Sequence, residues 1–546
     1  MNKPFMETVQ CSISTLSPVH IGCGEDYYPT NYVIDGGFLH HFGEEALLKS
    51  LNSTELDNLV KLANEADEDS IRKIQGDIYK KKDPLKNYAT HTVPVSKELE
   101  KFYLSRIGKT SQHESGGKKV NNQLAIARHA FNPYSNTPYF AGSSIKGAIR
   151  TALLNAENDG RALPEKLTGN HPAKTSNRQL QENVLKYRDI TDDPLRLLKI
   201  SDANYQHPDA LHGLEIRFAA NRKNKVIKEG AITKVNNGIP ILLECLPAYR
   251  HCSFSFHINF LTDEKLNYRW NIKQIAQTCN DFFLQHLLKE LDLIQHPELN
   301  YVDNQWANGL KKLLAGELGN ALKQNQAFLL RIGKYGGAES NTLNGVRHIK
   351  ITQGKDKKTG KNNPDKYLSK TTTIWLAGDN KDQQRDLLPF GWVLVEIGNT
   401  KLTQTAQFLT SQAAADYQKQ QQLQALSEQR TQFLAEEQKR RALKAQQEAE
   451  VIEKQRLQVE AQAVRTAQLA MMSAEQQIIF ELTEAFAKDK NPDPNGTLRQ
   501  ALTRAIKQAE NWSAVDKQVL LTIGNALCNV WGKPKKLKDQ LKTLQG

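Results

Sequence analysis

Apolar and polar residues alternate along several separate segments of the chain, and this pattern predicts half-buried β-strands. The clearest segment is 252–260, where Phe254, Phe256, Ile258 and Phe260 would share one face. Shorter or more apolar segments of the same kind lie at residues 8–14, 32–34, 214–219, 239–246 and 328–333. Strand-forming sequence therefore occurs in both halves of the first 400 residues.

Other segments have the spacing of amphipathic helices. Leu56, Leu59, Val60 and Ala63 fall on one helical face, and residues 272–322 are also helical in pattern. Residues 399–491 contain neither glycine nor proline and are rich in Gln, Ala, Glu, Lys and Arg, so we expect one or two long helices there. The apolar residues of that stretch hold no steady seven-residue spacing, which disfavours a regular coiled coil.

These patterns predict an α+β protein in four parts, because strands and helices recur in two halves as two fused ferredoxin-like units would give. The expected parts are a first unit at 1–200 with a helical insertion at about 45–120, a second unit at 201–400 with a glycine-rich loop, a helical arm at 401–490 and a small helical domain at 491–546. We expect truncation after about Thr400 to leave a folded core.

Composition narrows the class of partner. The 546-residue chain has a formal net charge of +13 and a pI near 9.2, which favours a polyanionic partner, although basic loops on an ordinary soluble protein would give the same excess. A mean hydropathy of -0.59, and no unbroken apolar run of roughly 20 residues, predict no membrane span. Residues 1–7 lack the apolar region of a signal peptide. The six cysteines show no Cys-x-x-Cys spacing, so we expect reduced thiols in the cytoplasm and no zinc or other metal site.

The segment 138–154 has the pattern of a strand end, a glycine turn and a cationic helix start. Gly142 permits a tight turn, Ser143 and Ser144 favour an N-cap, and the first N–H groups of the helix would face an anion. Lys146 and Arg150 would lie four residues apart on one flank, with Gly147 between them. The alternative is an ordinary capped helix with two solvated cations.

The loop 331–340 contains a glycine-lysine pair, but it lacks the order of a Walker A loop. Its glycines would let bare backbone approach a sugar-phosphate chain, two cations would neutralise phosphates and a tyrosine would stack on a base. The residues concerned are Arg331, Gly333, Lys334, Tyr335, Gly336 and Gly337. A simple hairpin turn is the alternative.

Together these segments resemble the RAMP superfamily, the ferredoxin-like RNA-binding proteins of CRISPR effector complexes. The segment 138–154 is similar to the glycine-serine-lysine signature of that superfamily. Residues 16–25 with 32–35, 330–337 and 388–392 resemble, in order, motifs of the subunits that cap one end of the type III-A, or Csm, complex. The resemblance implies binding of the 3′ end of the guide RNA (crRNA), with His20 in the first loop. Implied partners are the target RNA, other Csm subunits, above all the repeated RAMP backbone subunit, and host nucleases that trim the guide.

The same resemblance implies no catalysis and no cofactor. The repeated backbone subunits that this chain resembles cut RNA with an aspartate in the loop after the first strand, and the matching position here is Thr30 or Asn31. Glu25, Asp26 and Asp35 are the nearby carboxylates, one of which a shifted match would restore. His20 is the histidine nearest the first motif. Two alternatives stay open: a stand-alone endoribonuclease that processes guide precursor, and a helical scaffold with an incidental basic surface.

Overall fold

A computed structural model describes residues 5–65, 67–109, 112–113, 119–120, 124–162, 177–206, 213–224, 240–262, 270–351, 353–354, 359–360 and 363–545. The chain divides into two compact units, residues 1–434 and 435–546. The first unit combines helices with sheets whose strands are mostly antiparallel, so the predicted α+β class is confirmed.

A seven-stranded antiparallel sheet forms the centre of the first unit, with the order β15-β20-β1-β14-β11-β9 and β10 also paired to β14. Its strands are β1 (Met6–Thr15), β9 (Tyr139–Phe140), β10 (Leu198–Ile200), β11 (Ala203–Tyr205), β14 (Arg250–Leu261), β15 (Ala327–Arg331) and β20 (Trp392–Ile397). The alternation predicted for residues 252–260 is confirmed, since Phe254, Phe256, Ile258 and Phe260 are all buried.

A second sheet has six strands in the order β19-β18-β12-β13-β8-β2. They are β2 (Gly22–Tyr27), β8 (Ile126–His129), β12 (Glu215–Lys223), β13 (Leu242–Cys245), β18 (Thr373–Gly378) and β19 (Leu388–Pro389). Both sheets draw strands from before and after residue 200, because β1 pairs with β14 and β20, and β8 pairs with β13. The sheets therefore do not follow the expected division at residue 200. The start of the strand predicted at 239–246 lies outside the described residues.

Three smaller sheets account for the other strands in the described residues of the first unit. One joins β3 (Tyr32–Asp35), β4 (Phe38–His41) and β5 (His91–Pro94). The others are the pairs β6 (Gln112–His113) with β7 (Lys119–Val120), and β16 (Ile349–Ile351) with β17 (Lys366–Leu368).

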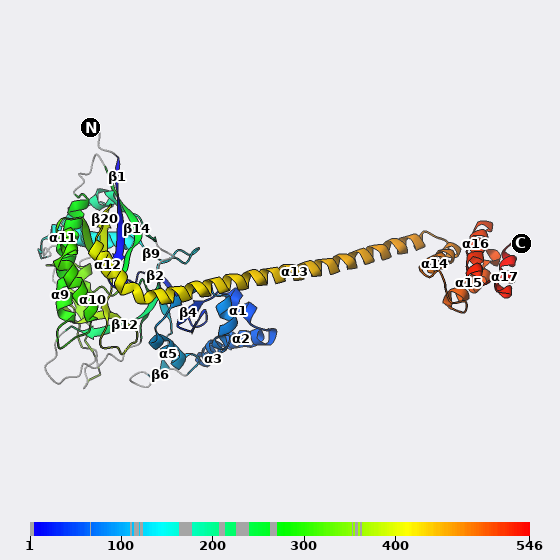
Figure 1. Cartoon of the computed structure of the whole chain (residues 1–546), viewed down its shortest axis with the longest axis horizontal. Coiled ribbons are helices and arrows are strands. Elements are labelled where there is room, and N and C mark those ends of the chain that lie inside the picture. The colour runs from blue at the N-terminus through cyan, green and yellow to red at the C-terminus, as the bar shows by residue number, and fades with distance from the viewer. Residues whose placement is uncertain are drawn as a thin grey trace. The chain divides into compact units, whose positions relative to one another are not determined.

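Helices pack against the central sheet and fill its core. Figure 1 shows α9 (Ile272–Ile294), α10 (Asn304–Ala315) and α11 (Glu317–Lys323) gathered beside β1, β14 and β20. A capping box of Asn271 and Gln274 fixes the start of α9, where Asn271 accepts from the Gln274 N–H. The helix α6 (Gly142–Asn158) packs on α9 and is followed by α8 (Asn177–Leu185).

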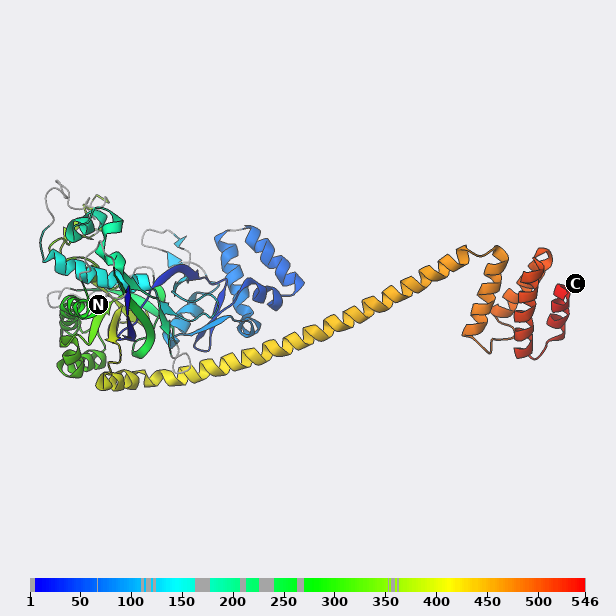
Figure 2. The ribbon, with the colours of Figure 1, turned by 90° about the horizontal axis from the view of Figure 1, so that it is seen from above.

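Helices lie between β4 and β5, within the stretch where a helical insertion was expected, but Val60 and Ala63 of the expected apolar face are exposed and Leu62 is the buried residue of that helix. The helices of the insertion are α1 (Glu44–Ser50), α2 (Ser53–Glu65), α3 (Glu68–Lys80) and α4 (Lys82–Asn87), and α5 (Lys97–Arg106) follows β5. They are the blue helices of Figure 2. Phe102 of α5 packs edge-on against Phe218 of β12, so α5 contributes to the core under the second sheet.

The expected boundary at residue 400 falls inside the first unit. Leu402 and Leu409, in or just before α12 (Thr403–Gln412), belong to the main core, and Phe408 lies against Gly309. Helix α13 (Asp416–Ala470) begins in this unit, where Arg430 donates hydrogen bonds to Ala89 O and Thr92 Oγ1.

The second unit contains the rest of α13 and four shorter helices around a core of their own. These are α14 (Ala474–Lys488), α15 (Thr497–Gln508), α16 (Ala514–Val530) and α17 (Lys535–Lys542). A capping box of Ser473 and Gln476 starts α14, whose Ile479 and Leu482 are core residues. The helical domain therefore begins near Ser473 rather than at residue 491. Among the described residues, no helix combines the length and the apolar character that crossing a membrane requires.

Candidate nucleic-acid interface

The start of α6 differs from the serine cap that the sequence predicts. Ala141 occupies the N-cap position without a side-chain hydrogen bond, and Ser143 and Ser144 already lie inside the helix. The Gly142 N–H donates to Asp202 Oδ1 at 2.7 Å. A carboxylate of the protein thus takes the place at the helix start where an anionic ligand was expected, and the prediction of a serine cap is wrong.

The reason for glycine at position 142 is close packing within the protein. A Cβ there would lie 2.5 Å from Ile200 O and 2.7 Å from Ser201 O, both backbone atoms. Any side chain would therefore push α6 away from the segment between β10 and β11. By contrast, a Cβ on Gly147 would meet nothing within 4 Å, and Gly147 is exposed.

The two cations of α6 already have acceptors in the protein. Lys146 is half-buried and its Nζ donates to Leu198 O at 2.7 Å. Burial, and then the nearby Lys199 and Arg150, lower the pKa of Lys146. The Arg150 guanidinium contacts three side chains, Gln181 Oε1 at 2.6 Å, Asp193 Oδ2 at 2.8 Å and Tyr187 OH at 3.5 Å. Arg150 therefore holds α6 to the following segment, which corrects its expected role as a phosphate ligand.

The glycine-rich loop is hydrogen bonded to the loop that follows β1. The Lys334 N–H donates to His20 O at 2.9 Å, and the Gly391 N–H donates to Pro18 O at 2.8 Å. Gly333 has a φ of 90°, and a Cβ on it would lie 2.3 Å from His20 O. Only glycine fits between these two loops. Three segments singled out in the sequence, at 16–25, 330–337 and 388–392, therefore meet at one place.

Within this loop, Arg331 is part of the core and not a surface cation. Its side chain is 5% exposed and pairs with Glu290 of α9. The Arg331 Nε also donates to Phe390 O at 3.0 Å, and the guanidinium lies 4.9 Å from the centre of the Trp392 ring. The prediction that Arg331 neutralises a phosphate is corrected, because Arg331 is buried and pairs with the Glu290 carboxylate, itself only 10% exposed.

Tyr335 is also engaged by the fold. Its ring packs at 5.0 Å from that of Trp375 and at 5.6 Å from that of Phe390, and partial burial raises the pKa of its hydroxyl. It adopts a φ of 67°, which is uncommon for a residue with a side chain. The ring expected to stack on a base is therefore packed in an aromatic cluster.

Lys334 is the exposed cation of the loop, and its ammonium group lies beside the exposed Gly22. A Cβ on Gly22 would lie 3.1 Å from Lys334 Nζ and 3.4 Å from His20 Nε2. Because Gly22 lacks a side chain, its backbone lies open beside an ammonium group. Gly336 is buried against another side chain of the loop, while Gly337, with a φ of 79°, is exposed. We call Gly22 and Lys334 the notch residues.

A buried polar network supports the notch from below. His20 Nδ1 lies 2.7 Å from Glu244 O and so donates to it, while Tyr27 OH donates to Glu244 Oε1 at 2.6 Å. The His129 N–H donates to Glu244 Oε2 at 2.9 Å, and His91 Nε2 lies 3.6 Å from Oε1. These contacts keep the pKa of Glu244 below its usual value although burial alone would raise it.

This network does not favour a catalytic role for His20. His20 and His129 are fully buried, and burial lowers the pKa of both imidazoles, that of His129 to about 3. His20 Nε2 has no hydrogen-bond partner among the described residues and is closed off from solvent. A general base needs access to the proton that it removes, and His20 lacks this access.

Of the carboxylates near the first motif, Asp35 is held in ion pairs. Asp35 pairs with Lys82 and Lys86 at 2.5 Å each. Although partial burial alone would raise the pKa of Asp35, hydrogen bonds from both lysines lower it. The Asn31 side chain accepts from the Tyr28 N–H and closes a turn. In the same region Thr30 is exposed, and Asp26 lies 3.4 Å from Tyr28 OH.

Sequence patterns gave no sign of Glu244 or Glu290, which organise the site. Each lies more than 40 positions from its main partner, Glu290 from Arg331 by 41 and Glu244 from Tyr27 by 217. The only sequence signal was their carboxylate side chains, because a buried carboxylate is costly unless it has hydrogen-bond or charged partners.

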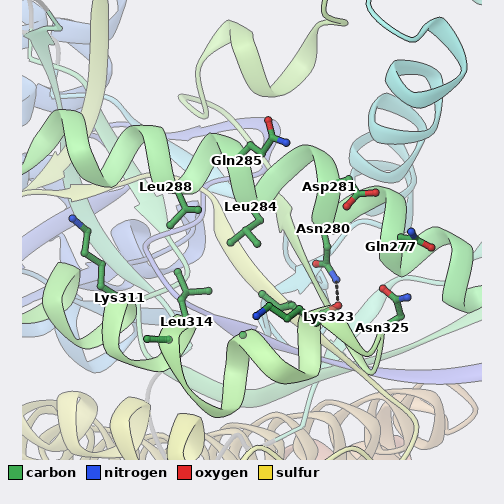
Figure 3. A pocket seen from close by; sticks show the side chains of 13 residues that line it. Gln277, Asn280, Asp281, Leu284, Gln285, Leu288, Lys311, Leu314, Lys323 and Asn325 are labelled. Carbon is green, nitrogen blue, oxygen red and sulfur yellow. Dashed lines mark hydrogen bonds between the residues drawn. The ribbon is translucent and has the colours of Figure 1, made fainter.

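The structure also has a pocket of about 630 Å³ between α9, α10 and α11 (Figure 3). It is lined by Leu284 and Leu288 of α9, by Lys311 and Leu314 of α10, and by Lys323 of α11. No residue singled out in the sequence lines this pocket, so it is separate from the notch.

Comparison with known proteins identifies the protein family to which the chain belongs. The family model of the RAMP superfamily matches residues 12–337, more than half of the chain, and the chain belongs to that superfamily. It is also similar to the protein named CRISPR system Cms protein Csm5 of Methanocaldococcus jannaschii, with 28% identity over 202 residues. That match covers 36% of this chain and 43% of the relative, so the chain spans less than half of the relative's length. The resemblance stated from the motifs is confirmed.

Two solved structures are similar to the chain. One belongs to the cryo-EM structure of a Csm-crRNA-target RNA ternary complex of a type III-A CRISPR-Cas system, with a TM-score of 0.42 and 15% identity over 71% of this chain and all of that one. The other is the crystal structure of T. onnurineus Csm5, with a TM-score of 0.37 and 16% identity over 59% of this chain and 89% of that one.

Proposed function

We propose that this chain is a non-catalytic subunit of a type III-A CRISPR effector complex that binds the 3′ portion of the guide RNA and caps the filament of backbone subunits. Its partners are then the crRNA, the target RNA paired with it, and other Csm subunits. Membership of the RAMP superfamily and similarity to Csm5 support this proposal. So does the net charge of +13, since neutralised phosphates dominate affinity for nucleic acid.

One observation assigns a phosphate contact to particular atoms. The first loop and the glycine-rich loop meet, and the Lys334 ammonium group lies beside the bare backbone of Gly22. A phosphate that contacts the Gly22 backbone would lie beside the Lys334 ammonium group, which would neutralise it. Ser143 and Gly147, exposed on α6, and the half-buried Lys146 are the further contacts that we retain. The other residues predicted from the sequence to bind RNA would support the interface from within the fold. They are His20, Gly142, Ser144, Arg150, Arg331, Gly333, Tyr335 and Gly336.

We also propose that each main sheet is the core of one ferredoxin-like unit. In the central sheet, β1, α6, β10 with β11, β14, α9 and β20 follow one another as β-α-β-β-α-β, with other elements inserted between them. The two units would then interleave along the chain.

Binding of labelled guide RNA, measured by fluorescence anisotropy over a range of salt concentrations, tests the RNA role. Lys334→Ala should weaken binding and reduce the slope of log K against log salt by about 0.7, the value for one phosphate of single-stranded nucleic acid. Lys401→Ala removes another exposed lysine, outside the notch, and serves as the control. Equal slopes for Lys334→Ala and wild type would contradict the assignment of the notch.

A cleavage assay tests the non-catalytic role. Purified chain should leave both a repeat-containing precursor RNA and a target RNA intact, with or without Mg²⁺. A product that disappears in Asp26→Ala would show that the match at Thr30 or Asn31 is out of register.

A further inference from the structure

A group of three possible metal ligands lies on the central sheet, and none of the three is a notch residue. His251 and Cys252 belong to β14 and Glu396 belongs to β20. Cys252 Sγ lies 3.4 Å from His251 Nε2 and 3.3 Å from Glu396 Oε1, and His251 Nε2 lies 3.6 Å from Glu396 Oε1. A thiol, an imidazole and a carboxylate therefore converge on one small space.

The fold brings these groups together by a break in the strand register. Along β1 and β14, Ile13 faces Phe254 but Thr15 faces Arg250, so three residues of β14 bulge opposite Ser14. Neighbouring side chains on a regular strand point to opposite faces, and this bulge lets His251 and Cys252 approach the same space. Cys252 has a φ of 42°, a conformation that costs free energy for a residue with a side chain.

The spacing of the three groups fits tetrahedral zinc ligation. With usual Zn–S, Zn–N and Zn–O bonds and tetrahedral angles, the ligand atoms lie about 3.6 Å apart for S and N, about 3.5 Å for S and O, and about 3.3 Å for N and O. The three distances in the structure each lie within about 0.3 Å of these values. Cys, His and Glu together are a donor set that suits zinc better than magnesium or calcium.

The surroundings also favour a cation. The Glu396 side chain is 2% exposed, and its Oε1 accepts from Ser14 Oγ at 3.4 Å as well as from the thiol. Ser14 Oγ in turn accepts from the Cys252 N–H at 2.8 Å, so it fixes both partners. Outer contacts of this kind orient metal ligands. His251 is 29% exposed, which leaves one side accessible to water and to an arriving ion.

We propose that His251, Cys252 and Glu396 bind one zinc ion, with a water molecule as the fourth ligand. On binding, the Cys252 thiol transfers its proton to solvent and becomes a thiolate, while the His251 imidazole binds in its neutral form. The ion would tie β14 to β20 across β1, which lies between them (Figure 1). The proposal is independent of RNA binding, because none of the three residues belongs to the notch.

Metal binding to the full chain, prepared with a histidine-free affinity tag and stripped of metal, tests the proposal. Zinc titrated against a chromophoric chelator should bind one ion per chain, and Co²⁺ should give a thiolate-to-metal charge-transfer band. Cys252→Ser, His251→Gln and Glu396→Gln should each weaken binding at least tenfold, and Cys252→Ser should remove the band. Zinc should raise the melting temperature of wild type but not of Glu396→Gln.

Two variants control for other ligands. Cys23→Ser removes an exposed thiol, and His257→Gln removes an exposed imidazole from the same strand, so both should bind zinc as wild type does. Should Cys252→Ser fail to fold, the cobalt band of wild type and of Cys23→Ser still decides. If wild type shows no such band, or binds zinc no more tightly than Glu396→Gln, the three groups form only a hydrogen-bonded cluster and the proposal is overturned.

Discussion

The ion pair between Arg331 and Glu290 gives a sharp test of whether the glycine-rich loop is held by its arginine or uses that arginine to bind RNA. In Arg331→Met the Glu290 carboxylate, only 10% exposed, would keep the Trp392 Nε1 donor at 3.1 Å but lose its charged partner. Removing one member of a buried pair typically costs about 3–5 kcal/mol, and we expect about 3 kcal/mol because Glu290 retains some contact with water.

The double variant Arg331→Met with Glu290→Met separates the two roles. Because it removes both charges and keeps similar volume, it should recover most of the lost stability, with a coupling free energy of about 2–3 kcal/mol. Since the chain has two units, whole-protein melting does not isolate this region. Hydrogen exchange of the amides of β15 and β20 measures the opening free energy locally.

RNA binding by the double variant then completes the test. If Arg331 only supports the loop, the folded double variant should show the same salt dependence of guide RNA binding as wild type. The reasoning is refuted if Arg331→Met leaves exchange protection of β15 unchanged, or if the stable double variant loses the slope of one phosphate contact.

Three further predictions concern stability. Gly142→Ala should destabilise the protein by about 1–3 kcal/mol, because the new Cβ would meet backbone oxygens. Gly147→Ala lies on the open face of the same helix and should be neutral or stabilising by about 0.5–1 kcal/mol. Equal melting temperatures of the two variants would contradict this prediction. Burial lowers the pKa of His40 and His286 to about 4, so between pH 6.5 and 4 the unfolded chain binds protons that the folded chain does not. The free energy of unfolding of the first unit should therefore fall by up to about 1.4 kcal/mol per pH unit for each histidine as the pH falls from 6.5 to 4. Melting followed by circular dichroism measures this loss. The second unit contains no histidine, and an equal pH dependence there would refute the cause. Truncation after Leu434 should leave the melting temperature of the first unit unchanged. Truncation after Thr400 removes the buried Leu409 and should lower that melting temperature. Equal melting temperatures of the two truncated chains would support the boundary near residue 400 that the sequence predicted.

The strands could be predicted because their signal is local. The alternation at 252–260 reports one buried face, and all four apolar residues of that face are buried in β14. The pairing of the strands could not be predicted in the same way. Nothing in residues 8–14 indicates that they pair with residues around 258 on one side and 395 on the other. The expected division at residue 200 failed to match the sheets for this reason.

The candidate site shows the same limit. The family resemblance assigned residues of both 16–25 and 330–337 to guide binding, and a backbone hydrogen bond from Lys334 to His20 joins these loops. Which cations face solvent depended on carboxylates far along the chain. Arg331 meets Glu290 and Arg150 meets Asp193, while Lys334 has no ion-pair partner in the described part of the chain. Charge in a motif therefore identified the loop but not the side chain that remains exposed.

Because β1 lies inside the central sheet, it is synthesised long before one of its two partner strands. β1 ends at Thr15, but its neighbour β20 is not complete until Ile397. At the usual rate of about 5–20 residues per second, a ribosome needs about 20–80 s to make the intervening chain. Throughout that time one edge of β1 lacks its partner, and unpaired edges attract other strands. A newly made chain would therefore need protection of its first strand by a chaperone or by neighbouring helices until the last strand of the sheet emerges.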